Sequence, residues 1–275
     1  MLFESHSHTP LCKHAVGDPV EYAAAAFERG LKGIHVTCHN PMPDGFSHHV
    51  RMSESEFDRY EELVAIAADE FRGRVDVCLG LEADFFEGHE AYLERQLASK
   101  DFQFVLGSVH PQIGEFRQRY WQDDLHEVQR VYFDLLAKSA ETGLFDSLAH
   151  PDLIKNFTAE AWDEAKSLEF IRPALDRIAK TGVAMELNTS GLLKTIPEMN
   201  PFPNMLREMN ERDIPITLGA DAHKPSRVAD KYVEAMELLL DVGYQEVNFF
   251  VNRKRQTVPI SAAIESLELS IDPTP

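Results

Sequence analysis

Histidine and carboxylate side chains occur at short, repeated intervals in this sequence of 275 residues, which has 12 histidines. The segment His6-Ser7-His8 is the first such group. In an extended chain, residues two apart project from the same face, so both imidazoles can reach one ion. The segment Asp221-Ala222-His223 offers a carboxylate and an imidazole with the same geometry. Both pairs therefore indicate metal coordination.

A carboxylate in an apolar segment adds to these pairs. Glu82 lies within CLGLEADF, where an unpaired charge is costly unless it is coordinated or paired. A salt bridge to Lys or Arg is the ordinary alternative. No basic residue stands at the ends of the other predicted strands, so a metal ion is the better counter-charge for Glu82.

A single histidine at a strand end is usually structural, so the metal prediction rests on the whole set. For that reason we assign structural or surface positions to His35, His48, His49, His89 and His126. The candidate ligands are His6, His8, His14, His39, Glu82, His110, His150, Asp221 and His223. A catalytic zinc ion uses about three protein ligands, so nine ligands predict two or three ions. Imidazole and carboxylate without thiolate suit Zn, Fe or Mn.

The candidate ligands fall at the ends of predicted strands in a chain that alternates between strands and helices. We predict strands over 2–8, 33–39, 75–82, 102–110, 144–150, 183–188, 214–223 and 246–251, and helices over 18–30, 53–73, 88–99, 124–142, 159–180, 203–212 and 226–241. This alternation is typical of βα units around a parallel sheet. In a βα barrel the carboxyl ends of the strands share one face, and the active site is built there.

Two helix starts carry strong local signals. Asp18-Pro19 with Glu21 gives an acidic N-cap, a proline in the first turn and a capping glutamate. Ser53 with Glu56 repeats the capping box. These signals support the helical part of the pattern.

Composition excludes several classes of protein. With 27 Lys and Arg against 46 Asp and Glu, the formal charge is −19, which disfavours nucleic acid and anionic membranes as partners. No apolar run approaches the ~20 residues of a membrane span, and the amino terminus lacks the features of a signal peptide. Three cysteines do not make a disulfide framework and suit the reducing cytoplasm. We therefore expect residues 1–275 to form one cytoplasmic α/β domain, with its oligomeric state left open.

Seven segments together resemble the PHP family, named for polymerase and histidinol phosphatase domains, and within it the histidinol-phosphatase branch. The segments are SHSHTPLCKH (5–14), TCHNPMP (37–43), GLEADF (80–85), GSVH (107–110), AHPDLIKNF (149–157), ELNTSGLLKT (186–195) and LGADAH (218–223). The resemblance implies a distorted TIM-like (β/α)7 barrel with a trinuclear metal centre at the carboxyl ends of the strands. Our eighth strand, 246–251, conflicts with seven, so it is either an edge strand or part of an incomplete closure.

The family pattern also divides the ligands among three divalent or mixed-valence ions. It implies one ion on His6, His8, Glu82 and Asp221, a second on Glu82, His110 and His150, and a third on His14, His39 and His223. Glu82 would then bridge two ions.

The chain departs from the family pattern at several positions. Relatives usually have an acidic residue in place of Cys38 and an aspartate in place of Glu4, so both changes are expected to alter the groups that orient the ligands. Because Cys38 is adjacent to His39 in the strand, its side chain is expected to point to the opposite face. Relatives often carry a basic residue where this chain has Asn156 or Leu193. We take the adjacent Lys155 and Lys194 as the replacements.

The activity that the resemblance implies is hydrolysis of L-histidinol phosphate, a small phosphate ester of histidine biosynthesis. A hydroxide bridging two ions would attack phosphorus while the ions neutralise the phosphoryl oxygens. We expect catalytic roles for Asp221 and His223, with Asp221 guiding the proton. Arg51 is the first candidate for a phosphate contact, followed by Lys155 and Lys194, although each could equally be a solvated surface charge.

Three alternatives stay open at this stage. A phosphoesterase of the same family could act on a nucleotide, a sugar phosphate or an oligonucleotide end, although the charge of −19 argues against the last. A metal-storage or structural barrel would need saturated ions. A metal-dependent amide or lactone hydrolase usually has a carbamylated lysine, and no lysine stands at a predicted strand end.

Overall fold

The computed structural model describes residues 2–271, which form an α/β fold. Its strands are β1 (Phe3–Ser7), β2 (Gly33–Val36), β3 (Asp76–Asp84), β4 (Phe104–Ser108), β5 (Ser147–Leu148), β6 (Ala184–Asn188), β7 (Ile216–Gly219), β8 (Glu246–Val251) and β9 (Lys254–Pro259). The strands form one sheet in sequence order, β1 to β9. All neighbouring pairs from β1 to β8 are parallel, and β9 pairs with β8 in the antiparallel direction.

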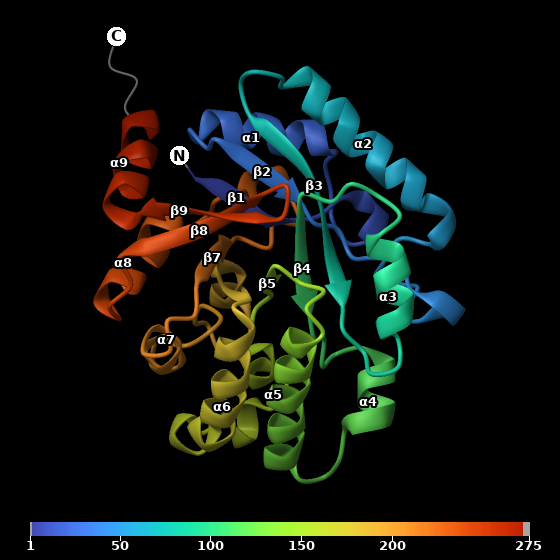
Figure 1. The fold of residues 1–275 in the computed structure, drawn as a ribbon, viewed down its shortest axis with the longest axis vertical. Helices are drawn as coiled ribbons and strands as arrows, with labels where there is room; N and C mark the ends of the chain where they lie inside the picture. Colours follow the sequence, from blue (N-terminus) through green and yellow to red (C-terminus); the bar gives the residue numbers. More distant parts are fainter. Residues whose placement is uncertain (1, 272–275) are drawn as a thin grey trace.

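Helices follow most of these strands and lie outside them (Figure 1). They are α1 (Pro19–Glu28), α2 (Phe57–Glu70), α3 (Glu90–Leu97), α4 (Gly114–Tyr120), α5 (Leu125–Glu141), α6 (Glu164–Ile178), α7 (Pro203–Asn210), α8 (Tyr232–Asp241) and α9 (Ile260–Ile271). The predicted capping boxes are present: the Asp18 N–H donates to Glu21 Oε1 (2.8 Å) and the Ser53 N–H donates to Glu56 Oε2 (2.8 Å). In the part of the chain described, no helix is both long and apolar enough to cross a membrane.

The end of β1 also pairs with the segment that follows β7. The Ala222 N–H donates to the His6 carbonyl (2.9 Å), and the His8 N–H donates to the Ala222 carbonyl (3.0 Å). This parallel bridge between Ser7 and Ala222 brings the first and seventh strands together at their carboxyl ends. As a result, the His6-Ser7-His8 and Asp221-Ala222-His223 segments are neighbours although they are far apart in the sequence.

The predicted strand at 246–251 is present as β8, which is not the edge strand because it lies between β7 and the edge strand β9. It pairs with β7 only through Thr217 and Asn248, and it forms a hairpin with β9. The sequence analysis missed β9 because its residues, KRQTVP, are mostly polar and exposed, as an edge strand allows. It also missed the short polar helix α4 and the final helix α9.

Several predicted elements are shorter in the structure. The strand predicted over 144–150 is reduced to β5, which has two residues, because the backbone turns at His150 with φ at 27°. The helix predicted from 226 begins only at Tyr232, because Ala229 and Lys231 have positive φ angles of 50° and 63°. These turns interrupt regular hydrogen bonding, and apolar periodicity does not reveal them.

Candidate metal centre

The nine predicted ligands gather at the carboxyl ends of the strands. Seven of them line a cavity of about 270 Å³, together with Gln112, Leu153 and Lys194: His14, His39, Glu82, His110, His150, Asp221 and His223. His6 and His8 are buried beside Glu82 and Asp221. The fold therefore brings together residues from the ends of β1, β2, β3, β4, β5 and β7.

Glu82, near the end of β3, lies among five imidazoles. Its Oε1 atom is 3.1 Å from His150 Nε2 and 3.3 Å from His110 Nε2. Its Oε2 atom is 2.8 Å from His39 Nδ1 and 3.5 Å from His6 Nε2. His8 Nε2 also lies 3.7 Å from Oε2. Each oxygen thus faces a different set of histidines, a geometry that suits a carboxylate shared between two ions.

Asp221 faces the histidines of β1 from the opposite side. Its Oδ1 atom lies 3.1 Å from His8 Nε2 and 3.6 Å from His6 Nε2. Ser190 Oγ donates to the other carboxylate oxygen, Oδ2, at 3.0 Å. This hydrogen bond leaves Oδ1 directed at the imidazoles.

His14 and His223 face each other at the open side of the cavity, with 2.9 Å between their Nε2 atoms. His14 Nδ1 donates to the Cys12 carbonyl (2.7 Å), and His223 Nδ1 donates to the Asp221 carbonyl (3.0 Å). A neutral imidazole that donates from Nδ1 presents a lone pair at Nε2. Two lone pairs at this distance repel unless a proton or a cation lies between them.

Several buried atoms of the site have no hydrogen-bond partner within the described chain. They include His6 Nε2, His8 Nε2 and Glu82 Oε2. Buried polar atoms are normally paired, because an unpaired one loses its hydration without compensation. A metal ion can accept lone pairs from imidazole nitrogens and carboxylate oxygens at the same time. This set of ligand atoms suits Zn, Fe or Mn. The residues present therefore fit bound metal.

Two further buried carboxylates orient the histidines, and the sequence analysis missed both. Glu186 Oε1 accepts from His6 Nδ1 at 2.8 Å, and Asp84 Oδ1 accepts from His110 Nδ1 at 2.6 Å. A carboxylate on the far nitrogen of a ligating histidine fixes its tautomer and ring orientation. Spacing could have indicated Asp84, which is two residues after Glu82 and so on the same face of β3. Glu186 had the same signal as Glu82, a carboxylate within an apolar strand.

The electrostatics of the site divide the imidazoles into two kinds. Burial disfavours a charged His110, but Asp84 and Glu82 outweigh it and raise its pKa to about 10. Burial lowers the pKa of His39 to about 4 and that of His223 to about 3. Burial acts to raise the pKa of Glu82, yet the surrounding histidines hold it well below its usual value. Without metal, protons on some imidazoles balance the negative charge of the carboxylates. Metal binding must therefore displace these protons.

Two of the candidate ligands have strained backbones. His150 has φ at 27° and Asp221 has φ at 49°, in the left-handed region that non-glycine residues seldom adopt. Such strain costs about 1–3 kcal/mol and persists where the surroundings enforce it, often at functional sites. Here it turns both side chains toward Glu82 and His8.

Of the three cations predicted to contact phosphate, only Lys194 lines the cavity. Arg51 is buried and forms an ion pair with Asp84, and it donates to the Asn40 carbonyl at 2.9 Å. Lys155 is fully buried, and its Nζ atom lies 2.9 Å from Asp152 Oδ2. Both Arg51 and Lys155 therefore have carboxylate partners within the protein, which leaves Lys194 as the predicted cation at the cavity.

Two of the departures from the family pattern, Glu4 and Cys38, occupy buried positions near the ligands. Glu4 accepts the N–H groups of His6 (3.0 Å) and Ala220 (2.9 Å), so it ties β1 to the end of β7. Cys38 turns away from the cavity, and its sulfur accepts a hydrogen bond from Thr9 Oγ1 (3.2 Å).

The five histidines assigned to structural or surface positions do not line the cavity. His35, for example, is buried and donates from Nε2 to the Phe250 carbonyl at 2.8 Å. The remaining four are His48, His49, His89 and His126.

A mainly parallel sheet with imidazoles and carboxylates gathered at its carboxyl end defines this molecule as an α/β protein with a candidate metal centre. A family model for the PHP domain matches residues 4–190. The chain belongs to the PHP domain family.

Relatives of known name cover nearly the whole chain. The probable histidinol-phosphatase of Deinococcus radiodurans is 40% identical over 255 residues, which is 90% of this chain and 96% of that protein. The histidinol-phosphatase of Bacillus subtilis is 25% identical over 266 residues, covering 85% of this chain and 98% of that protein.

A solved structure shares the fold. The crystal structure of histidinol phosphate phosphatase from Lactococcus lactis, complexed with zinc, L-histidinol and phosphate, matches with a TM-score of 0.78 at 22% identity. The match covers 93% of this chain and 98% of that chain.

Proposed function

We propose that this protein is a metal-dependent phosphatase that hydrolyses L-histidinol phosphate to L-histidinol and phosphate. The observation that carries the proposal is the convergence of nine imidazole and carboxylate ligands around one cavity, with Lys194 in its wall. The cavity of about 270 Å³ adjoins a second hollow of about 600 Å³ that shares His14, Lys194, Asp221 and His223, so the site has room for a small ester. Relatives named histidinol-phosphatases align over most of the chain and support this substrate.

We propose three metal ions of Zn, Fe or Mn. His6, His8, Glu82 and Asp221 would hold the first, Glu82, His110 and His150 the second, and His14, His39 and His223 the third. The two oxygens of Glu82, which face different histidines, support its place between two ions. When bound, such ions lower the pKa of water and neutralise charge on a phosphoryl group.

The protein's own residues have separate tasks in this proposal. Glu186 and Asp84 hold His6 and His110 with the unprotonated nitrogen turned inward. The Lys194 ammonium donates to a phosphate oxygen at the cavity wall. Asp221 accepts the proton of the attacking water and passes it toward the leaving alkoxide, which becomes the hydroxyl group of L-histidinol.

We further propose that residues 1–275 form a single domain, a distorted TIM-like (β/α)7 barrel that acts in the cytoplasm. The hydrogen bonds between β1 and the segment after β7 would close the barrel at its carboxyl end. The β8–β9 hairpin would then be an addition at the edge. None of the three cysteines forms a disulfide, which is compatible with a reducing compartment.

Phosphate release from a panel of monoesters tests this function. The panel contains L-histidinol phosphate, a nucleoside monophosphate and a sugar phosphate, and each is measured before chelation, after chelation and after repletion with metal. We expect the highest kcat/KM for L-histidinol phosphate and loss of activity without metal. Preference for another ester would favour the second candidate, a phosphatase for a different small substrate. Full activity after complete metal removal would contradict the mechanism.

A further inference from the structure

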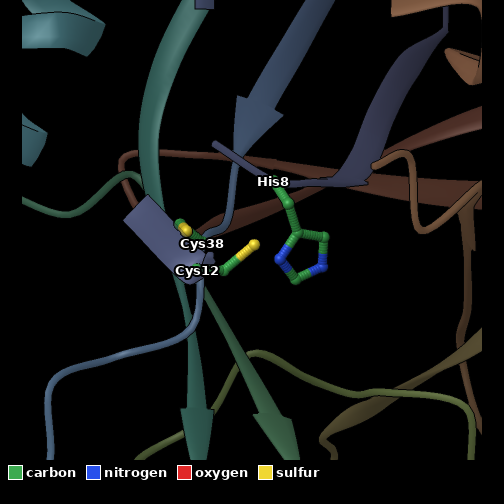
Figure 2. Close-up of side chains that lie close together, drawn as sticks. All are labelled: His8, Cys12 and Cys38. Carbon is green, nitrogen blue, oxygen red and sulfur yellow. The ribbon is translucent and has the colours of Figure 1, made fainter. Parts of the chain in front are cut away.

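Two cysteines lie beside His8, and one of them, Cys12, also has its sulfur within 4.8 Å of donor atoms of His14 and His223. The donor atoms of His8, Cys12 and Cys38 all lie within 4.8 Å of one another, and all three residues are buried. Figure 2 shows the sulfur of Cys12 directed at a ring nitrogen of His8, with Cys38 next to Cys12. Cys12 belongs to the short turn after β1, and Cys38 follows β2.

His8 is placed between this sulfur pair and the metal centre. Its Nε2 atom faces Asp221 Oδ1 at 3.1 Å. Its Nδ1 atom is buried and has no hydrogen-bond partner in the described chain. In His6, His14, His110 and His223, Nδ1 bonds to an oxygen of a carboxylate or carbonyl. The Nδ1 atom of His8 differs from these four, because it has no oxygen partner and lies close to the cysteine sulfurs instead.

We infer that His8, Cys12 and Cys38 form a second kind of metal site, a sulfur-containing site for a thiophilic divalent cation such as Zn²⁺. Zinc binds thiolate sulfur at about 2.3 Å and imidazole nitrogen at about 2.0–2.1 Å, usually with four ligands. Donor atoms within 4.8 Å of one another reach such distances through small side-chain movements. Two thiolates and an imidazole leave one position for water or a carbonyl group.

The surroundings of Cys38 can accommodate a metal-bound thiolate. Thr9 Oγ1 donates to Cys38 Sγ at 3.2 Å, a bond that a thiolate accepts better than a thiol does. The Cys38 S–H donates to the Thr9 carbonyl at 3.7 Å, and metal binding would release this proton. Thr9 and Cys12 lie in the same turn as His14, so an ion on both sulfurs would tie this turn to the end of β2. His8 would then join the two sites through its two ring nitrogens, after loss of its ring protons.

Cobalt absorption spectroscopy tests this site in the full-length protein. Co²⁺ is added to metal-free protein, and thiolate-to-cobalt charge-transfer absorption is recorded in the near ultraviolet. Imidazole and carboxylate ligands give no such band. Cys38→Ser separates the proposed site from an ion held by Cys12 with His14 and His223, because only the proposed site loses its band in that variant. We expect the band in the wild type, and we expect the Cys12→Ser/Cys38→Ser double variant to lose it and to bind one ion fewer per chain.

Cys78→Ser is the matched control, since Cys78 lies on β3, outside the cluster, and should leave the band intact. The wild-type spectrum is decisive even if the double variant does not fold. A fully loaded wild type without the band would overturn the inference, and so would a band that persists in Cys38→Ser. A disulfide between Cys12 and Cys38, seen as missing free thiols after denaturation, would also refute it. The spectrum does not depend on phosphatase activity, so this inference and the proposed function can fail separately.

Discussion

Replacing Glu186 by glutamine should weaken metal binding by reversing the tautomer of His6. Glu186 Oε1 accepts from His6 Nδ1 at 2.8 Å, while Oε2 accepts from the His150 N–H (2.8 Å) and Asn188 Nδ2 (2.9 Å). A glutamine has only one acceptor oxygen. If that oxygen serves the two donors at the Oε2 position, the amide NH₂ group faces His6 Nδ1. His6 must then accept at Nδ1 and carry its proton on Nε2, the atom that faces Glu82.

The opposite orientation of the glutamine is also unfavourable. With the oxygen toward His6, the NH₂ group faces two buried donors, and a buried unsatisfied group costs about 1–3 kcal/mol. Removal of a group that orients a metal-binding histidine typically lowers metal affinity or activity by about 10–100-fold. This factor corresponds to about 1.4–2.8 kcal/mol, since each tenfold change is about 1.4 kcal/mol. We therefore expect a Glu186→Gln protein to bind zinc at least ~10-fold more weakly.

Competition with a chromophoric chelator measures zinc affinity in the folded protein, and circular dichroism checks the fold. Glu4→Gln is a suitable control, because Glu4 is an equally buried glutamate that contacts the backbone of His6 and not its ring. The control should lower the melting temperature while zinc affinity changes little. Wild-type zinc affinity in folded Glu186→Gln would refute the tautomer argument.

Three further predictions follow from buried and cavity-lining charges. Arg51→Ala leaves Asp84 buried without its partner, so thermal or chemical denaturation should show a loss of about 3–5 kcal/mol, and unchanged stability would exclude this role. Lys194→Ala should raise KM for the phosphate ester about 10-fold with a smaller effect on the melting temperature, and an unchanged KM would remove Lys194 from the phosphate site. Although burial opposes it, neighbouring carboxylates raise the pKa of His8 to about 9 and that of His110 to about 10, above the usual 6.5. Their contribution to stability is therefore complete below pH 6.5 and lost as the pH rises toward 10. Melting temperatures should fall over this range in metal-free protein but not in zinc-loaded protein, and equal profiles would contradict this prediction.

The spacing of residues along the sequence predicts most of the strands and the candidate metal ligands. The features that it does not predict depend on contacts between residues far apart in the sequence. Residues such as His6 and Glu82 can be placed at strand ends because alternation in a strand and the direction of a parallel sheet are local rules. The partner of Arg51 is a different matter, because Asp84 lies 33 residues away and only the folded chain brings the two together. The polar edge strand β9 could not be predicted from its own residues either, because it depends on pairing with β8 and not on an apolar pattern of its own.

The overall charge of −19 does not describe the site. Of the residues lining the cavity, only Glu82 and Asp221 are acidic, whereas five are imidazoles and one is Lys194. Bound cations would make this region positive, while most acidic side chains lie elsewhere on the protein. Because bound metal ions are often the largest local charges in a site, they determine its attraction for a phosphate more than distant surface carboxylates do. Salt screens those distant charges over about 8 Å at physiological ionic strength. The proposed attraction of a small phosphate ester to this cavity is therefore compatible with the acidic charge of the whole protein.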